Sequence, residues 1–194
     1  VDHCTRLCHA SSVAALLENI GSGAVTASFS ECRNAEAIIV IGANPTVNHP
    51  VAATFIKNAA QRGARLYVLD PRGQHLDRYA THSLNFTPGS DVALLNAMIN
   101  VIISEALYDA AYVRDHTEGF SELKERTSST TPEAMAPICG IAPEVIREVA
   151  RGYASAEGAM IFWGMGISQH THGTDNSRCL ISLALLTGNI GRAG

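Results

Sequence analysis

The chain of 194 residues has no excess of positive charge and no long hydrophobic run. Lys and Arg number 14 against 18 Asp and Glu, which gives a formal net charge of -4 with both signs scattered along the chain. Binding of nucleic acid needs a basic stripe, so we expect no nucleic-acid partner. The longest apolar run, residues 37–42, is far below the roughly 20 residues of a membrane-spanning helix, and no charged-then-apolar leader opens the chain. We therefore expect no membrane span.

Disulfide-scaffold spacing is also missing, and the number of cysteines is odd. The five are Cys4, Cys8, Cys32, Cys139 and Cys179. Cysteines spread in this way are typical of a reducing compartment and not of small secreted domains. The sequence therefore predicts a cytoplasmic protein.

No G-x-G-x-x-G motif joins the first predicted strand to its helix, which excludes an ordinary nicotinamide-binding fingerprint. The chain does have 46% hydrophobic and 16% charged residues, over a length that suits one well-filled core. Val1 is not a start residue, and residues 188–194 break off in a loop. We therefore expect residues 1–194 to be one domain of a larger protein.

Short apolar strands alternate with helical patterns along the chain. Residues 37–42 form a β-branched run that ends in glycine, the pattern of a strand buried on both faces. Further strands are predicted at residues 65–70, 83–86 and 159–163, and helices at residues 49–62, 92–107, 109–116, 143–156 and 174–186. The polar residues 118–131 are expected to be exposed. This alternation predicts an α/β fold, with a mostly parallel twisted sheet and helices on both faces, as in Rossmann-like domains.

The loops that follow the strands share one edge of such a sheet, where ligands bind in open α/β folds. These loops contain Gly42, Asn44, Asp70, Arg72, Asp91, Gly164 and Gly166. Asp70 can accept hydrogen bonds from a ribose or an amino-purine edge, and Arg72 offers a bidentate fork for phosphate. Taken singly, each loop is better explained as a turn. Their convergence on one crevice weakens that explanation. The ligand is then a nucleotide other than a nicotinamide dinucleotide, or there is none.

Cys8 and His9 stand together in the order Arg6-Leu7-Cys8-His9. A free cysteine is commonly a small core side chain, and the local sequence leaves that interpretation open. The alternative is a thiolate that binds a soft metal, since Arg6 and His9 would both lower the pKa of the Cys8 thiol.

Two other groupings are weaker candidates for a metal or redox site. Cys4 and Cys8 are four residues apart, but no second cysteine pair follows at ligand spacing and the usual C-x-x-C motif is absent. We therefore expect no four-cysteine cluster within this chain. His170 and His172 could form a second ligand pair, although histidines in an exposed loop, or one buried histidine, explain them better.

Several segments together carry a resemblance that covers essentially the whole chain. They are residues 4–13 with Arg6-Leu7-Cys8-His9, Ile41-Gly42-Ala43-Asn44-Pro45 followed by His49-Pro50, Asp70-Pro71-Arg72, Ser90-Asp91-Val92-Ala93-Leu94-Leu95-Asn96-Ala97, and Trp163-Gly164-Met165-Gly166 with Gln169. In these segments the chain resembles the large alpha subunit of molybdopterin-dependent formate dehydrogenases, most of all the soluble NAD-linked type.

The resemblance implies a bis-molybdopterin guanine dinucleotide cofactor that holds molybdenum or tungsten. Cys8 matches the cysteine that binds the metal, and His9 matches the histidine after it. This pair favours formate dehydrogenases over nitrate reductases, which lack the histidine, and over sulfoxide reductases, which use serine. The same matching implies cofactor contacts at Gly42, Asn44, Asp70, Arg72, Asp91, Gly164, Gly166 and Gln169. Gly73 occupies a position where relatives usually have a second cationic side chain, so we expect weaker phosphate binding there.

The reaction that the resemblance implies is the two-electron oxidation of formate to carbon dioxide. Cys8 would tune or leave the metal, and His9 would orient formate or carry the proton. A 4Fe-4S cluster and a substrate-binding arginine would lie outside this chain, in other domains of the subunit. Iron–sulfur and flavin subunits would be its partners, and the 194 residues alone are expected to be inactive. The alternatives are a related enzyme such as a nitrate or arsenate reductase, a non-catalytic structural homologue, and a thiol redox protein.

Overall fold

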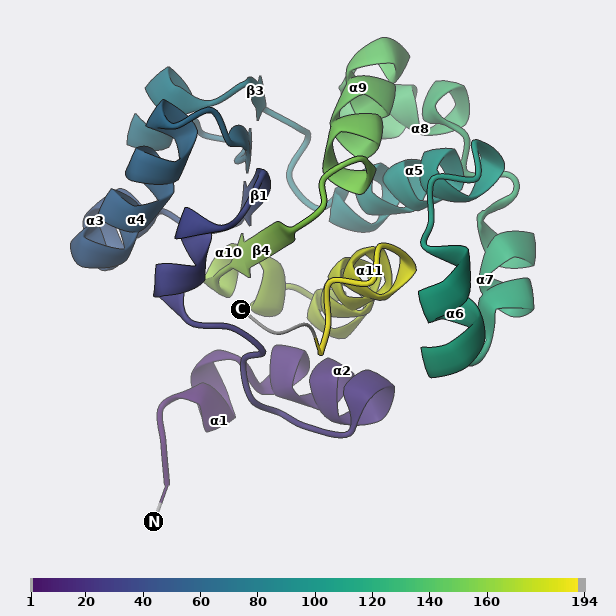
Figure 1. Cartoon of the computed structure of the whole chain (residues 1–194), viewed down its shortest axis with the longest axis horizontal. Helices are drawn as coiled ribbons and strands as arrows, with labels where there is room; N and C mark the ends of the chain where they lie inside the picture. The colour runs from purple at the N-terminus through teal and green to yellow at the C-terminus, as the bar shows by residue number, and fades with distance from the viewer. Residues whose placement is uncertain (1, 192–194) are drawn as a thin grey trace.

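The fold is built on a four-stranded parallel sheet. It is taken from a computed structural model that describes residues 2–191, so the predicted chain ends at Val1 and at residues 192–194 lie outside it. The strand order is β3-β2-β1-β4, with bounds β1 (Ala37–Ile41), β2 (Arg65–Leu69), β3 (His82–Leu84) and β4 (Ala159–Trp163) (Figure 1). In the register, Ile39 pairs with Tyr67 on one side and with Ile161 on the other. The predicted α/β class, the parallel sheet and all four predicted strands are confirmed, with small shifts at the strand ends.

Helices connect the strands and cover the sheet. In chain order they are α1 (Thr5–Cys8), α2 (Ala10–Ile20), the 3-10 helix η1 (Phe29–Arg33), α3 (Pro45–Asn48), α4 (Pro50–Gln61), the 3-10 helix η2 (His75–Tyr79), α5 (Asp91–Ser104), α6 (Ala110–His116), α7 (Phe120–Thr127), α8 (Pro132–Cys139), α9 (Pro143–Ala154), α10 (Met165–Ser168) and α11 (Gly173–Leu186). The helices expected from the sequence are present as α4, α5, α6, α9 and α11. Helix α5 ends at Ser104 and not at residue 107, because the chain turns at Ala106, whose φ is +53°.

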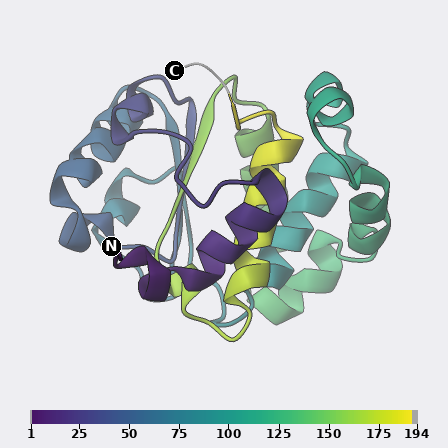
Figure 2. The ribbon, with the colours of Figure 1, turned by 90° about the horizontal axis from the view of Figure 1, so that it is seen from below.

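The two faces of the sheet are covered by different helices. Strand β1 is buried at every position, and its side chains alternate between the faces. Ile38 and Val40 pack with residues of α4, η1 and η2, whereas Ile39 and Ile41 pack with residues of α5, α9 and α11. Figure 2 shows the sheet between these two layers. The prediction of helices on both faces is therefore confirmed.

Helices α7 and α8 are among those that the sequence analysis did not predict. Residues 118–131 are largely exposed, as expected, but α7 forms within them, because Phe120 and Leu123 pack against the main core. The Phe120 ring lies 4.8 Å, centroid to centroid, from that of Tyr108. Helix α8 begins after Thr131, whose hydroxyl accepts a hydrogen bond from the Ala134 N–H. A Thr-Pro pair at a helix start was the signal in the sequence that would have predicted α8.

The helix that follows the Cys8-His9 segment was also missing from the prediction. Helix α2 packs along α11 through a small apolar cluster of Ala15, Leu16 and Ile181, with Trp163 at its side. Figure 1 shows α2 lying across α11 on the side away from α5. This contact holds the start of the chain close to the end of β4.

All five cysteines are free thiols. Cys32, Cys139 and Cys179 are buried, and burial raises the pKa of Cys32 to about 11 and that of Cys179 to about 12. These three are core residues, unlike Cys4, which is exposed, and Cys8, which is half-buried. Within residues 2–191, no helix has the length and the apolar character that crossing a membrane requires.

Candidate functional site

The loops after β1 and β4 meet through the backbones of glycines. The Gly166 N–H donates to the Gly42 carbonyl oxygen over 2.9 Å. A Cβ at Gly42, whose φ is +56°, would lie 2.8 Å from the Gly166 carbonyl carbon, and one at Gly164 would lie 2.9 Å from the Gly42 oxygen. No side chain fits at these distances. The three glycines therefore serve the packing of the two loops, and their contact with a ligand stays a prediction.

The loop after β2 is organised by the side chain of Asp70, which is buried. Its Oδ1 accepts from the Arg72 N–H over 2.8 Å, and its Oδ2 accepts from Gln74 Nε2 over 3.4 Å. Gln74 Nε2 also donates to the Ala43 carbonyl over 2.7 Å, which ties this loop to the one after β1. Asn85, just after β3, donates to the Asp70 carbonyl over 2.8 Å. The sequence analysis missed Gln74 and Asn85 as residues that join these loops.

Arg72 and Asn44 lie on the same edge in different environments. The Arg72 side chain is exposed, and its guanidinium has no hydrogen bond or ion pair with any residue from 2 to 191. Asn44 is half-buried, and its Oδ1 accepts from the Thr46 hydroxyl over 2.7 Å. An exposed, unpaired guanidinium remains able to bind a phosphate.

Asp91 is the first residue of α5 and is 3% exposed. Burial raises the pKa of its carboxyl, while its own backbone N–H and the nearby His170 act in the opposite direction. The proximity of His170 places the loop between α10 and α11 beside the start of α5. The predicted convergence of the strand-end loops is thus visible for all four loops.

Cys8 ends α1 with a half-buried side chain, so it is not a core residue. The prediction that Arg6 and His9 lower the pKa of its thiol was wrong. The pKa of Cys8 is raised, first by burial and then by the neighbouring Cys4. The reason is that Arg6 pairs with Asp2 over 3.2 Å instead of turning toward the sulfur.

The segment around Cys8 is docked on the segment that follows β4. Gln169 Nε2 donates to the Cys8 carbonyl over 3.3 Å, and His9 Nδ1 lies 2.9 Å from the Ser168 hydroxyl. The Ser11 hydroxyl donates to the Ser168 carbonyl over 2.6 Å. These contacts bring together predicted site residues from opposite ends of the chain, namely Cys8, His9 and Gln169. They meet at the edge formed by the carboxyl ends of the strands, called the carboxyl edge below. Ser168 was not predicted.

His170 and His172 are both exposed, in the turn between α10 and α11. This confirms the interpretation as exposed loop histidines. Among the described residues, no group of three or more His, Cys, Asp and Glu side chains is arranged to hold a metal ion.

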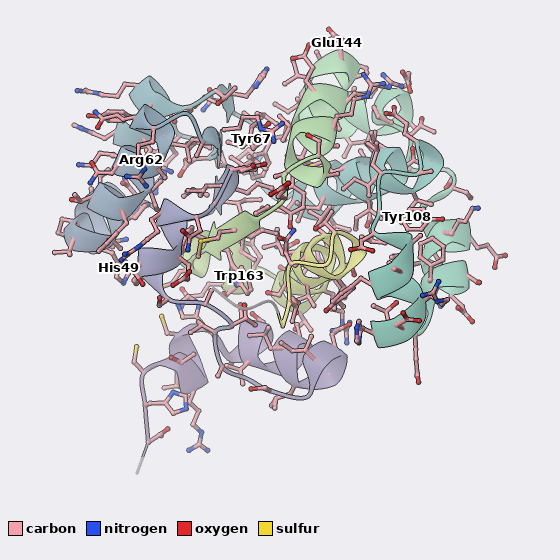
Figure 3. All side chains as sticks on the ribbon, viewed as in Figure 1. His49, Arg62, Tyr67, Tyr108, Glu144 and Trp163 are labelled. Carbon is pink, nitrogen blue, oxygen red and sulfur yellow. The ribbon has the colours of Figure 1, made fainter. Side chains whose placement is uncertain are left out.

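A cavity of about 580 Å³ runs beside β4, one of the two edge strands of the sheet. It is lined by all of β4, by side chains of α2 and α11, and by residues 23–29. Trp163 and His49, both labelled in Figure 3, lie in its wall. Of the predicted site residues, His9 alone among residues 2–191 lines this cavity. The others surround the exposed strand ends, so the cavity is not the predicted crevice.

Comparison with known proteins identifies the family. The family model for molybdopterin oxidoreductase matches residues 1–194. The chain is 43% identical over 194 residues to the F420-dependent formate dehydrogenase subunit alpha of Methanocaldococcus jannaschii, covering 100% of this chain and 29% of that protein. It is 43% identical over 192 residues to formate dehydrogenase H of Escherichia coli, covering 99% of this chain and 27% of that protein.

Among solved structures, acetylene hydratase from Pelobacter acetylenicus is similar, with a TM-score of 0.83 and 30% sequence identity over 94% of this chain and 25% of that one. The chain therefore spans less than a third of the length of these relatives. Since the family model covers every residue, the chain belongs to the molybdopterin oxidoreductase family, whose members bind a molybdopterin cofactor.

Proposed function

We propose that the protein containing this chain oxidises formate to carbon dioxide, with release of two electrons and one proton, at a molybdenum or tungsten ion held by two molybdopterin guanine dinucleotides. The observation that carries this proposal is the docking of Cys8 and His9 onto Gln169 and Ser168 at the carboxyl edge of the sheet. The similarity to two formate dehydrogenases supports the choice of substrate.

The residues at this edge fit the proposed cofactor. Cys8 offers a half-buried thiol, a soft ligand suited to molybdenum or tungsten, and metal binding would displace its proton despite its raised pKa. When bound, the metal supplies a centre that accepts two electrons. His9 would orient formate or hold the proton that leaves it.

The dinucleotide would lie along the loops that follow the strands. The carboxylates of Asp70 and Asp91 can accept hydrogen bonds from the N–H groups of guanine, and the exposed Arg72 can pair with a phosphate. The remaining proposed contacts are made by backbone groups or by the amides of Asn44 and Gln169. The glycines at positions 42, 164 and 166 let the loops after β1 and β4 pack backbone to backbone, which brings their backbone groups together.

The larger organisation is proposed from the same resemblance. Residues 1–194 would be one cofactor-binding domain, other domains of the subunit would supply a 4Fe-4S cluster, and iron–sulfur and flavin subunits would carry the electrons in the cytoplasm. NAD as the final acceptor stays a prediction, because one of the relatives above is F420-dependent and the name of the other gives no acceptor.

The full-length protein tests this proposal. Its metal and guanine dinucleotide are measured by mass spectrometry, and formate-dependent dye reduction is compared between the wild type, Cys8→Ser and Cys4→Ser. We expect both cofactor components in the wild type and a loss of activity of roughly 100-fold or more in Cys8→Ser. Cys4→Ser is the matched control, since it removes an exposed thiol four residues away and should keep the activity.

Two results would contradict the proposal. A protein with neither metal nor pterin would be a structural homologue that has kept the fold without the reaction. A protein that contains the cofactor but does not oxidise formate, and that reduces nitrate with electrons from a reduced dye, would be a related reductase. The similarity to acetylene hydratase makes this second assay necessary, because one fold can host different reactions.

A further inference from the structure

A cluster of hydroxyl groups lies behind the imidazole of His9. Ser168 Oγ lies 2.9 Å from His9 Nδ1 and 2.7 Å from Ser12 Oγ. Ser12 Oγ also lies 3.1 Å from Ser177 Oγ, and it accepts from the indole N–H of Trp163 over 2.9 Å. The three serines are all less than 9% exposed, so their hydrogen bonds are not exchanged for bonds to bulk water.

Each hydroxyl carries one proton, and this limits how the cluster can be arranged. Trp163 can only donate, so Ser12 accepts from it. Ser177 donates its proton to the Gly173 carbonyl over 2.9 Å, so the contact between Ser12 and Ser177 needs the Ser12 proton. Ser12 then has no proton for Ser168, so Ser168 donates either to Ser12 or to the Gly164 carbonyl, which lies 3.3 Å away. With its proton used, Ser168 can only accept from His9.

The opposite arrangement satisfies fewer contacts. If Ser168 donated to His9, its contact with Ser12 would need the Ser12 proton. Ser177 could then supply a proton to only one of its two contacts, with Ser12 or with the Gly173 carbonyl. One of these buried contacts would lack a hydrogen bond, and so would the contact of Ser168 with the Gly164 carbonyl, which costs free energy. The arrangement in which Ser168 donates to Ser12 is alone in placing a proton in each of the five contacts of 3.1 Å or less. If Ser168 donates instead to the Gly164 carbonyl, 3.3 Å away, it still accepts from His9.

We propose that Ser168 is a positioning residue that holds the proton of neutral His9 on Nδ1 and leaves the Nε2 lone pair open. Nε2 has no hydrogen-bond partner among residues 2–191, so it is the atom that can accept a proton or a hydrogen bond. The importance of this tautomer for turnover rests on the proposed formate oxidation. The tautomer itself is a property of the resting protein and does not depend on it.

The tautomer is measured by NMR of the histidine ring nitrogens in the full-length protein labelled with ¹⁵N-histidine. His9→Gln assigns the signals by their loss. We expect a protonated Nδ1 and an unprotonated Nε2 in the wild type, and a shift of the proton toward Nε2 in Ser168→Ala. A wild-type His9 with its proton on Nε2 would overturn the inference, whatever the enzyme does with formate.

Substitutions around the cluster separate positioning from packing. Ser168→Thr keeps the hydroxyl and should retain both the tautomer and the activity, whereas Ser168→Ala should lower formate turnover about 10-fold. Ser11→Ala is the matched control, because Ser11 contacts the Ser168 carbonyl and not the hydroxyl cluster. Equal turnover and an unchanged tautomer in Ser168→Ala would refute the positioning role. The expected tautomer without any formate activity would refute only the proposed function.

Discussion

The carboxyl edge of the sheet is held together in two different ways. On the side of β1 and β4, the loops meet backbone to backbone at Gly42 and Gly166, with no side chain between them. On the side of β2 and β3, side chains hold the loops: the Asp70 carboxylate accepts from the Arg72 N–H within its own loop, and Asn85 donates to the Asp70 carbonyl across to the next one. The first kind of contact tolerates no added atom, whereas the second can lose a bond and keep its shape.

This difference predicts which of the proposed cofactor-binding residues can be substituted without damage to the fold. Gly42, Gly164 and Gly166 are constrained by one another before any ligand is considered, so their presence is a requirement of the fold. Arg72, whose guanidinium has no partner within residues 2–191, is under no such constraint from the fold. Substitutions that add atoms should therefore be more damaging than substitutions that remove hydrogen bonds.

The largest effect is expected for Gly42→Ala. Its Cβ would overlap backbone atoms of Gly166 and Ile167, and backbone cannot rotate out of the way as a side chain can. We expect a loss of about 3 kcal/mol or more in the free energy of unfolding, measured by urea titration. Gly89→Ala is the control, since Gly89 also has a positive φ, +83°, but has no atom within 4 Å of the added Cβ. It should cost only about 1 kcal/mol. Equal losses would show that φ, and not the contact, makes glycine necessary at position 42.

A smaller loss is expected where the obstacle is a side chain. A Cβ at Gly152 in α9 would lie 1.9 Å from the hydroxyl oxygen of the buried Tyr67 on β2, which Figure 3 labels beside α9. We expect Gly152→Ala to destabilise the chain by about 2 kcal/mol. Tyr67→Phe removes that oxygen, so the double variant should recover part of the loss in a double-mutant cycle. Strictly additive losses would show that the two residues do not interact.

Removal of the Asp70 carboxylate should cost about 1 kcal/mol, because it deletes hydrogen bonds without adding atoms. Asp70→Ala loses both the bond from the Arg72 N–H and the bond from Gln74. Asp70→Asn keeps an oxygen for the shorter bond and should lose less than half as much. Hydrogen–deuterium exchange of residues 70–74 should increase in Asp70→Ala. If the amides of residues 70–74 exchange at the same rate in Asp70→Ala and Asp70→Asn, the hydrogen bond from the Arg72 N–H does not hold the loop.

The smallest effect is expected at a partly exposed ion pair away from the edge. Arg151 donates to both carboxylate oxygens of Glu105, over 2.6 and 2.8 Å, and lowers the pKa of Glu105 below its ordinary value of 4.5. A lowered pKa stabilises the fold above pH 4.5, and this contribution is lost as the pH falls through the value in the folded state. Arg151→Met should therefore lower the free energy of unfolding at pH 7 by less than any of the substitutions above, and should have no effect on it in strong acid. If the loss of stability in Arg151→Met is the same in acid as at pH 7, it comes from lost packing of the arginine side chain and not from the ion pair.

How far the sequence predicts this protein differs between its elements. The β-branched strands and the strongly apolar α5 were predicted because their patterns are local and leave one stable arrangement. Helices α7 and α10 were missed because they are short, and short helices owe their stability to packing that no local pattern records. The ends of β3 and α5 were misplaced for a related reason, since neighbouring strands and turns decide where an element stops.

The sequence by itself determined the parallel sheet, the shared edge of its loops and the adjacency of Cys8 and His9, because strand direction and covalent order follow directly from it. The tertiary structure decided which groups those residues meet. It placed the Ser168 hydroxyl against His9, 159 positions earlier in the chain, and this contact has no local signal because it depends on where a separate segment packs. The pairing of Arg6 with Asp2, away from Cys8, is a local contact between residues four positions apart. The pKa of a thiol and the tautomer of an imidazole follow from such contacts and not from chemical type alone.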